Sequence, residues 1–388
     1  MIREYKTSKY ILSSIVILFW FAQYIYVPCQ TPYLTAQAVT SSMIGVIVGA
    51  YGISQMMARL PVGVMADVAN KHKWFILCGA VSSGTASLIR ILSPGGSGFL
   101  IANLFSGFAS AMWISFMVMY RSFYDQKHQQ EGTSQIVMYN NIGMLLGFIG
   151  STLFYDKFGM VFLCLLSCLS GGIGAALSLF LPKELPGDLE RMQKPKLKIR
   201  ELLTVCKDHR LIVFALLMLV QQGIQMATVM SFTTQVMKDN GGSATFIGIA
   251  SVVFMLASVF TSMMAGTRIC IGPGWKLWVP LSFLLVAGYC ILVPITHTLW
   301  VFLILQVIPS ISSGILVSFL ISESMVNVPA EKHSTALGFF QATYAIGMTG
   351  LPIVMGAVVD AASMFMGYAV LALTAVIAAF ASILYGRR

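Results

Sequence analysis

Long apolar stretches follow one another along almost the whole chain, with short polar segments between them. Each stretch holds about 20 residues, the length that an α-helix needs to cross roughly 30 Å of hydrocarbon. The pattern therefore predicts a succession of membrane-spanning helices, whose ends are predicted to within about two to four residues. The twelve expected cores are residues 10–30, 42–60, 74–93, 99–120, 134–154, 160–181, 211–234, 245–266, 275–295, 300–322, 335–358 and 364–385.

Composition leads to the same interpretation. Apolar residues make up 57% of the 388 positions and charged residues only 10%, against about 25% charged in an ordinary globular protein. So few charges cannot cover the surface of a soluble protein of this size, and mean hydropathy is +0.82. The expected fold class is all-α, a polytopic membrane protein with 12 transmembrane helices.

The basic residues predict the orientation of the chain. The first apolar run follows basic residues as a signal peptide does, but no small-residue cleavage site follows Val27, so we expect this run to remain as the first span. If both termini are cytoplasmic, 21 of the 24 Lys and Arg lie on the inner side, and only Arg90, Lys157 and Lys238 lie toward the outside. This bias predicts cytoplasmic termini. The expected location is the bacterial inner (plasma) membrane.

A polar stretch divides the spans into two sets of six. Residues 183–210, rich in Lys, Glu and Pro, read as a cytoplasmic linker between an N-terminal six-helix bundle (1–182) and a C-terminal one (211–388). Within the linker, residues 199–206 fit an amphipathic helix on the membrane surface.

The two halves also repeat each other. Ser42 and Gly45 recur as Thr245 and Gly248, both 203 residues later. Asp156 and Asp360 each end the outward-running helix of their pair. Other positions match at separations of 200 to 203 residues, among them Gly63 with Gly266, Asn103 with Gln306 and Asn141 with Gln341. The recurrence indicates duplication of a six-helix unit, which predicts a substrate site between the halves near the midplane.

One loop carries a recognisable motif. Residues 59–73 read RLPVGVMADVANKHK, with Gly63, Asp67 and Lys71 at four-residue spacing between two apolar helices. Gly63 permits close helix approach, and Asp67 can accept hydrogen bonds or pair with a cation. An ordinary basic inner loop explains the segment equally well from its charges alone.

Together, the twelve spans, the duplication, the basic central loop and this motif resemble the major facilitator superfamily, with a pattern nearest to its short 12-helix drug and metabolite efflux branch. The family motif G-x-x-x-D-[RK]-x-G-[RK]-[RK] is matched in part, since Val68 and Asn70 replace the first basic residue and the second glycine. The resemblance implies two rocking bundles and an Asp67 that latches the cytoplasmic gate in the outward-facing state. Asn103 stands where proton-coupled drug antiporters have an arginine, and span five lacks their Gly-Pro pair, which weakens that assignment.

Charges at the inner rim suggest a wider gate. We expect Arg59, Asp67, Arg121 and Glu323 to form a network beside Gly63 and Lys71, with solvated helix ends as the alternative. Glu323 resembles an inner-gate acid that follows the tenth span in many family members. Lys71 and Lys73 are expected at the anionic inner leaflet.

The predicted path is lined by amides and aromatic residues, because no Asp or Glu lies in the middle of a span. Gln225 is the first choice as a substrate contact, with Asn141 and Gln341 facing it, although hydrogen bonds between helices explain any single amide as well. Arg90 is expected to snorkel outward from a peripheral third span. The candidate substrate residues are Gln23, Tyr26, Asn103, Trp113, Asn141, Gln222, Gln225, Gln306, Gln341 and Tyr344.

Several classes of function are disfavoured. The chain has no G-x-x-x-x-G-K-[ST] motif for an ATP-driven pump, no acid, base or nucleophile at membrane depth for an enzyme, and no metal-binding constellation among its cysteines and histidines. We expect a secondary active transporter that works by alternating access, without a cofactor, and exports small drug-like or metabolite molecules. Uptake of a neutral polar solute such as a sugar or nucleoside is the alternative, and a receptor or channel is the alternative from another class. The expected partners are the substrate, the lipid bilayer and, for coupled transport, a proton or another ion; we expect a monomer that binds no nucleic acid.

Overall fold

The computed structural model describes residues 6–69, 71–124, 129–182, 203–265, 267–328 and 333–387. These residues are almost entirely helical and contain no β-strand, which confirms the predicted all-α class. Eleven of the described helical stretches are long and apolar enough to cross a membrane.

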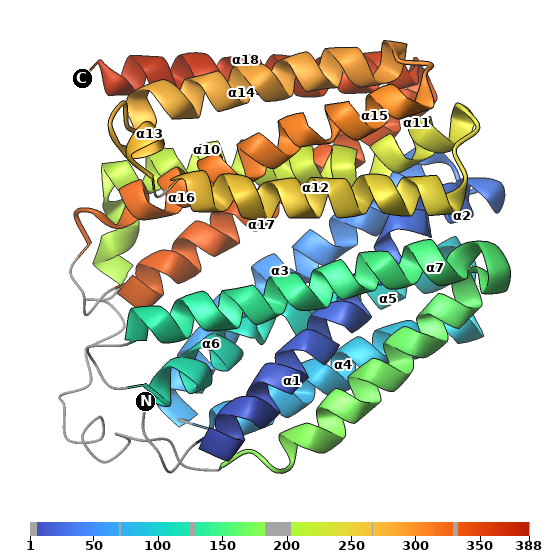
Figure 1. Cartoon of the computed structure of the whole chain (residues 1–388). Helices are drawn as coiled ribbons and strands as arrows, with labels where there is room; N and C mark the ends of the chain where they lie inside the picture. The colour runs from blue at the N-terminus through green and yellow to red at the C-terminus, as the bar shows by residue number, and fades with distance from the viewer. Residues whose placement is uncertain are drawn as a thin grey trace.

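The apparent loss of one span is explained by α7 (Gln129–Ser178), which contains the fifth and sixth predicted spans. A straight helix of 50 residues would be about 75 Å long, more than twice the thickness of the hydrocarbon. Gly159 interrupts it with a φ of 72° and a ψ of −175°, a conformation that glycine adopts readily. The chain turns back at this point (Figure 1), so each of the twelve predicted spans has a counterpart.

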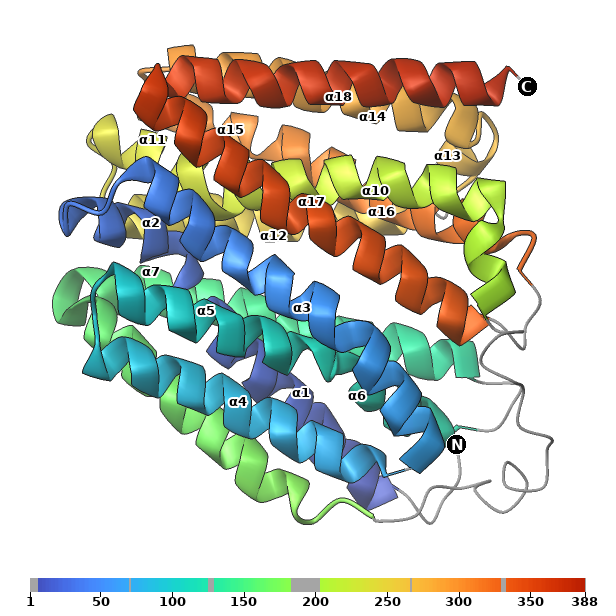
Figure 2. The ribbon, with the colours of Figure 1, turned by 180° about the vertical axis from the view of Figure 1, so that it is seen from behind.

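The helices of residues 6–182, here called the N-half, lie together on one side of the molecule (Figures 1 and 2). Besides α7, they are α1 (Lys6–Tyr24), α2 (Val27–Ala36), α3 (Ser41–Ala69), α4 (His72–Leu92), α5 (Gly96–Ala111) and α6 (Trp113–Ser122). The first span is divided between α1 and α2, and the fourth between α5 and α6.

The helices of residues 203–387, the C-half, lie on the other side. They are η3 (Leu203–Lys207), α10 (His209–Ala227), η4 (Thr228–Phe232), α11 (Thr233–Asp239), α12 (Ala244–Ala265), α13 (Arg268–Ile271), α14 (Trp275–Leu292), η5 (Val293–Ile295), α15 (Leu299–Leu305), α16 (Val307–Met325), α17 (His333–Ala361) and α18 (Met364–Gly386). Most of the predicted linker lies outside the described residues. Its described part holds η3 and the start of α10, and the division into two domains stays a prediction.

Small polar side chains tie the N-half helices together. Ser87 on α4 lies 2.6 Å from Ser167 on α7 (Oγ to Oγ), and Ser170 on α7 donates to the Leu18 carbonyl oxygen of α1 at 2.9 Å. Small residues let helix backbones approach closely in a membrane, where the hydrophobic effect does not drive helices together. Large apolar side chains cover the outer surface instead, as Leu153, Leu169 and Ile173 show on α7.

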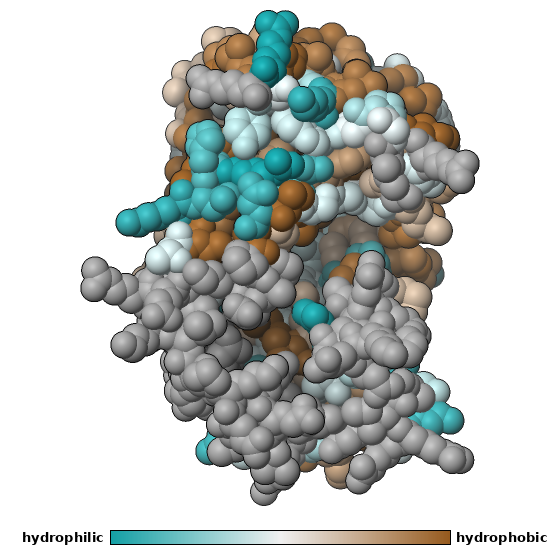
Figure 3. Space-filling model, turned by 90° about the vertical axis from the view of Figure 1, so that its left-hand side faces the viewer, coloured by the Kyte–Doolittle hydropathy of each residue, from teal (hydrophilic) through white to brown (hydrophobic). Residues whose placement is uncertain are grey.

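The two halves meet most closely at the end of the molecule opposite the chain termini. There α3 crosses α17 (Figure 2), and α7 crosses α12 (Figure 1). A Cβ atom built on Gly45 of α3 would overlap the Pro352 carbonyl oxygen of α17. We call this end the far face, and the end that carries both termini the terminal face. Figure 3 shows that the terminal face is hollowed between the halves.

Candidate substrate site between the halves

A pocket lies where the two halves face each other, and we call it the interface pocket. It has about 420 Å³ of empty space, part of it open to solvent. Amide, hydroxyl and thioether groups line it together with two valines, and none of its lining side chains is charged. The lining residues are Gln23, Tyr24, Tyr26, Val27, Gln30, Val48, Tyr51 and Asn103 from the N-half and Met226 and Met230 from the C-half.

The break in the first span brings polar side chains to this pocket. Helix α1 ends at Tyr24, and α2 begins at Val27 with Pro28 in its first turn. Proline has no backbone N–H, so it fits the first turn of a helix, where that N–H would have no partner within the helix. Beyond the pocket, toward the far face, the Thr31 and Ser231 hydroxyls lie 3.0 Å apart across the two halves.

Arg90 is not where the sequence analysis places it. Its side chain does not snorkel outward but is buried, with 1% of its surface exposed. Its Nη2 donates to the Asn103 Oδ1 at 2.7 Å, the Tyr26 hydroxyl at 2.8 Å and the Ser106 Oγ at 3.0 Å. The guanidinium also lies over the Tyr26 ring, 3.8 Å from its centroid.

The reason is the inward face of α4. Gly79, Ser83, Ser87 and Arg90 follow one another at three- or four-residue spacing, and all four lie on the buried side of the helix. Small side chains there let α5 and α7 come close, so the end of the same stripe points into the bundle. The spacing of these residues in the sequence could have predicted that Arg90 points inward, because a helix surrounded by lipid would not need a stripe of small and polar residues.

The amide side chains near Arg90 have only some of their polar atoms in hydrogen bonds. Asn103 donates its Nδ2 to the Ile47 carbonyl oxygen at 2.7 Å, and Gln23 donates its Nε2 to the Ser106 carbonyl oxygen at 3.2 Å. The Oε1 atoms of Gln23 and Gln30 are buried in the pocket wall, and no described residue donates a hydrogen bond to them. Because a buried polar atom without a partner is costly, these groups are suited to binding a ligand.

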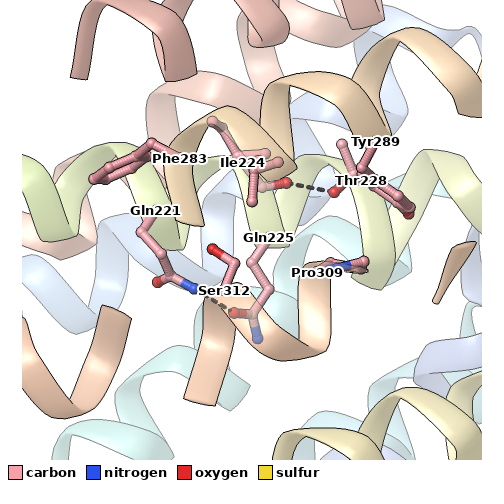
Figure 4. A pocket seen from close by; sticks show the side chains of 9 residues that line it. Gln221, Ile224, Gln225, Thr228, Phe283, Tyr289, Pro309 and Ser312 are labelled. Carbon is pink, nitrogen blue, oxygen red and sulfur yellow. Dashed lines mark hydrogen bonds between the residues drawn. The ribbon is translucent and has the colours of Figure 1, made fainter. Parts of the chain in front are cut away.

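A second, smaller pocket lies within the C-half (Figure 4). It has about 290 Å³ of empty space and is lined by Gln221 and Gln225 together with Phe283, Tyr289 and Ser312, among others. Gln221 donates its Nε2 to the Gln225 Oε1 at 2.9 Å. Gln225 thus borders this pocket rather than the interface pocket.

The remaining predicted substrate residues border neither pocket. Trp113 packs against the Trp20 ring, with centroids 5.3 Å apart. Gln306 is buried at the break between α15 and α16. Asn141, Gln222, Gln341 and Tyr344 are half-buried.

The sequence of this chain matches that of a known protein family. The sequence model of the Major Facilitator Superfamily matches residues 12–235 and 220–388, which together cover almost the whole chain. The chain belongs to the major facilitator superfamily. An uncharacterized MFS-type transporter of Methanocaldococcus jannaschii is 34% identical over 84 residues, which are 22% of this chain and 22% of that protein.

Solved structures of major facilitator proteins share the fold over nearly the full length. A bacterial homolog of the human lysosomal transporter Spinster, in an inward-facing and unoccupied conformation, matches with a TM-score of 0.77 at 13% identity, over 98% of this chain and 96% of that one. The nucleoside transporter NupG matches with a TM-score of 0.75 at 18% identity, over 98% and 99%. A POT family transporter in complex with 5-aminolevulinic acid matches with a TM-score of 0.75 at 14% identity, over 98% and 96%.

In this major facilitator protein, the predicted gate residues have partners that the sequence analysis did not assign. Arg59 on α3 donates its Nη1 to the Tyr344 hydroxyl on α17 at 2.6 Å, across the two halves. Glu323 on α16 pairs with Arg210 at the start of α10, inside the C-half. Arg121 is half-buried at the end of α6.

The motif loop is described only in part. The backbone of α3 is helical through Gly63 and Asp67, but the side chains there lie outside the described residues. Lys71 is exposed just before α4. Lys73 does not face the leaflet: it is buried, and its Nζ donates to the carbonyl oxygens of Leu179 and Leu181 at 2.6 and 2.8 Å. A lysine there complements the negative end of the helix dipole of α7.

Proposed function

We propose that this protein is a secondary active transporter that moves a small organic molecule through the interface pocket by alternating access. The observation that supports this most is the pocket itself, which takes its wall from both halves, since Gln23, Tyr51 and Asn103 face Met226 and Met230. A site shared by two repeats becomes accessible from alternate sides when one repeat rocks against the other.

The proposed substrates are small drug-like or metabolite molecules, and the proposed direction is export. Methionine and tyrosine walls suit an apolar or aromatic body, because methionine adapts to varied shapes. The short loops and compact length resemble the efflux branch. The amides of Gln23, Gln30 and Asn103 favour a second candidate, uptake of a polar solute such as a sugar or nucleoside.

Transport by inside-out and right-side-out vesicles tests both candidates. We propose cytoplasmic termini in a bacterial inner membrane, so export appears as accumulation in inside-out vesicles and uptake as accumulation in right-side-out vesicles. A panel of radiolabelled nucleosides, sugars and amphiphilic metabolites serves as probe, and a C-terminal reporter fusion checks the orientation.

A pair of variants tests the pathway. Met230→Trp fills the interface pocket and should abolish transport of every solute that the wild type moves, with a melting temperature near that of the wild type. Met263→Trp is the matched control, because Met263 is 72% exposed on the outside of α12. If Met230→Trp transports normally, the path does not run through the interface pocket.

A further inference from the structure

The charge around the interface pocket points to a class of substrate. Arg90 is a guanidinium at membrane depth, and its four hydrogen-bond acceptors (Tyr26, Ser87, Asn103 and Ser106) are all neutral. Its Nε has no partner among the residues that the structure describes. A buried charge is costly unless an opposite charge compensates it, so the described residues leave this cation open to a counter-charge.

Arg90 lies one side chain behind the pocket wall. Tyr26 and Asn103, which bond to it directly, both line the interface pocket. Arg59 is also buried, on the same helix, α3, that supplies Tyr51 to this wall. Its described hydrogen-bond acceptor, the Tyr344 hydroxyl, is neutral.

We propose that the interface pocket binds an anionic group of the substrate, a carboxylate or a phosphate, and that Arg90 is the main source of this selectivity. The inference rests on the proposed function and narrows its substrate class. The field of a guanidinium falls off slowly in a medium of low dielectric constant. The Gln30 amide can turn its N–H donors toward an anion, and organic cations are repelled.

The experiment measures the charge preference without a known substrate. Met230→Cys places a thiol in the pocket, and its rates of modification by anionic sulfonatoethyl and cationic trimethylammonioethyl methanethiosulfonate are compared by peptide mass spectrometry. The ratio of the two rates cancels changes in thiol reactivity. We expect the anionic reagent to be favoured about tenfold or more relative to the same ratio for free cysteine.

Variants of Arg90 test whether this residue causes the preference for the anionic reagent. Arg90→Gln in the Met230→Cys background should remove most of it, and Arg90→Lys should retain it. Ala362→Cys, in the exposed turn between α17 and α18, is the control thiol and should show no effect of Arg90→Gln. Should Arg90→Gln fail to fold, Arg59→Gln takes its place and should lower the ratio by a smaller factor.

Two results would overturn the proposal: a pocket thiol that prefers the cationic reagent, or a preference that the folded Arg90→Gln variant leaves unchanged. Either can occur while Met230→Trp still blocks transport, in which case alternating access stands and only the substrate class is wrong.

A different observation concerns the far face. The repeated pairs Ser42–Gly45 and Thr245–Gly248 begin α3 and α12, and Asp156 and Asp360 end the helices that cross them. Asp360 accepts hydrogen bonds from the Ser41 and Ser42 backbone N–H groups at 3.0 and 2.6 Å. Asp156 Oδ2 accepts from the backbone N–H and hydroxyl of Thr245 at 3.0 and 2.7 Å.

In each case, an aspartate of one half caps a helix of the other half. Both helices also have a local cap: the Thr40 Oγ1 accepts from the Met43 N–H, and the Ser243 Oγ accepts from the Phe246 N–H. The local caps satisfy the third N–H of each helix. The aspartate takes earlier ones, those of Ser41 and Ser42 in α3 and that of Thr245 in α12. The carboxylate therefore meets the positive end of the helix dipole.

The glycine of each pair lies one turn further along and permits the contact. A Cβ atom on Gly45 would overlap the Pro352 carbonyl oxygen, and one on Gly248 would overlap the Thr152 hydroxyl. At both places, therefore, the start of a helix is capped by an aspartate of the other half, and one turn later the same helix packs closely against that half.

We infer that these two cross-half caps are a clasp that closes the far face and stabilises the state open at the terminal face. Opening the far face must separate α3 from α17 and α12 from α7, which breaks both caps. Each cap should favour the closed far face by about two- to fivefold, as expected for a charge at a helix terminus.

Hydrogen exchange by mass spectrometry on the full chain tests the clasp. Asp156→Asn/Asp360→Asn should speed exchange at the starts of α3 and α12 and, at the same time, slow exchange at the terminal-face ends of α16 and α17, because the halves close there. Asp239→Asn is the control, since Asp239 lies at the same face but its described side-chain hydrogen bond is to Gln235 of its own helix.

Faster exchange confined to the starts of α3 and α12, without the opposite change at the terminal face, would show ordinary helix caps and overturn the inference. An unchanged exchange pattern would also overturn it. If the double variant does not fold, Asp360→Asn alone should give the same reciprocal pattern with a smaller amplitude.

Discussion

Arg90 and Lys73 are both buried cations, but they differ in their partners. Lys73 donates to two carbonyl oxygens of the turn that follows α7, those of Leu179 and Leu181, so the fold itself supplies the partners of its charge. The described partners of Arg90 are all neutral, so within the described part of the chain its charge has no counter-charge. Burial by itself therefore does not tell whether the fold satisfies the charge of a cation, whereas the partners do.

Lys73→Met should destabilise the protein. The substitution leaves the carbonyl oxygens of Leu179 and Leu181 without their charged donor, at a cost of about 2 kcal/mol. Lys71→Met is the matched control, because Lys71 is exposed and should change stability by less than about 0.5 kcal/mol. Thermal melting in detergent measures both variants. Equal melting temperatures would show that Lys73 adds no stability.

At the scale of helices, several spans are built from two pieces. The first breaks after Tyr24, the fourth at Met112, the seventh in the π-helical turn η4 and the tenth at Gln306. The breaks after Tyr24 and in η4 border the interface pocket. Interrupted helices free backbone groups and are tolerated in a membrane where they line a cavity. The spans that form the close crossings, α3, α12 and α17, are continuous instead.

Gly248→Val should disturb one of these crossings. Its side chain would overlap Thr152 and cost about 1–3 kcal/mol in the closed far face, which shifts the balance of states by about 5- to 150-fold. We expect a transport rate at least about fivefold lower. Gly288→Val is the control, because a Cβ atom there meets nothing within 4 Å. Normal transport by Gly248→Val would mean that this close crossing is not needed for the cycle.

At the scale of the whole molecule, carboxylates lie at the two ends of the described spans rather than in the middle. Asp156 and Asp360 lie at the far face, and Glu323 lies near the terminal face with Arg210. A proton coupled to transport therefore has no buried carboxylate at the centre of the cavity on which to travel.

We predict that any coupling to protons runs through Asp67 or Glu323, or through the charge of the substrate itself. In proteoliposomes held at zero membrane potential, a pH gradient should no longer drive transport by Asp67→Asn/Glu323→Gln, whereas Asp239→Asn should behave as the wild type. Asp67→Asn alone should abolish transport while the protein folds normally, if Asp67 latches the gate. Gradient-driven movement of a neutral solute by the double variant would contradict the prediction.

Much of the architecture can be predicted from the sequence, because each span depends on the apolar residues of its own segment. A run of about 20 apolar residues must cross the bilayer as a helix, whatever its neighbours are. Hence the twelve spans and the all-α class were predictable, and so was membership of the family, from the duplication and the motif at Gly63 and Asp67. The repeated Ser42–Gly45 and Thr245–Gly248 pairs were visible too, although their contacts with Asp360 and Asp156 were not.

The partners of polar groups were decided by the tertiary structure alone. Gln225 and Asn103 are both amides in apolar helices, yet they border different pockets, because helix rotation and the break in each span set where a side chain points. Arg90 and Asn103 lie on different spans, α4 and α5. Only the packing of these two helices brings the Arg90 Nη2 to 2.7 Å from the Asn103 Oδ1. Hydropathy places a residue along the membrane normal but not around the helix axis, so depth follows from the sequence and contact follows from the fold.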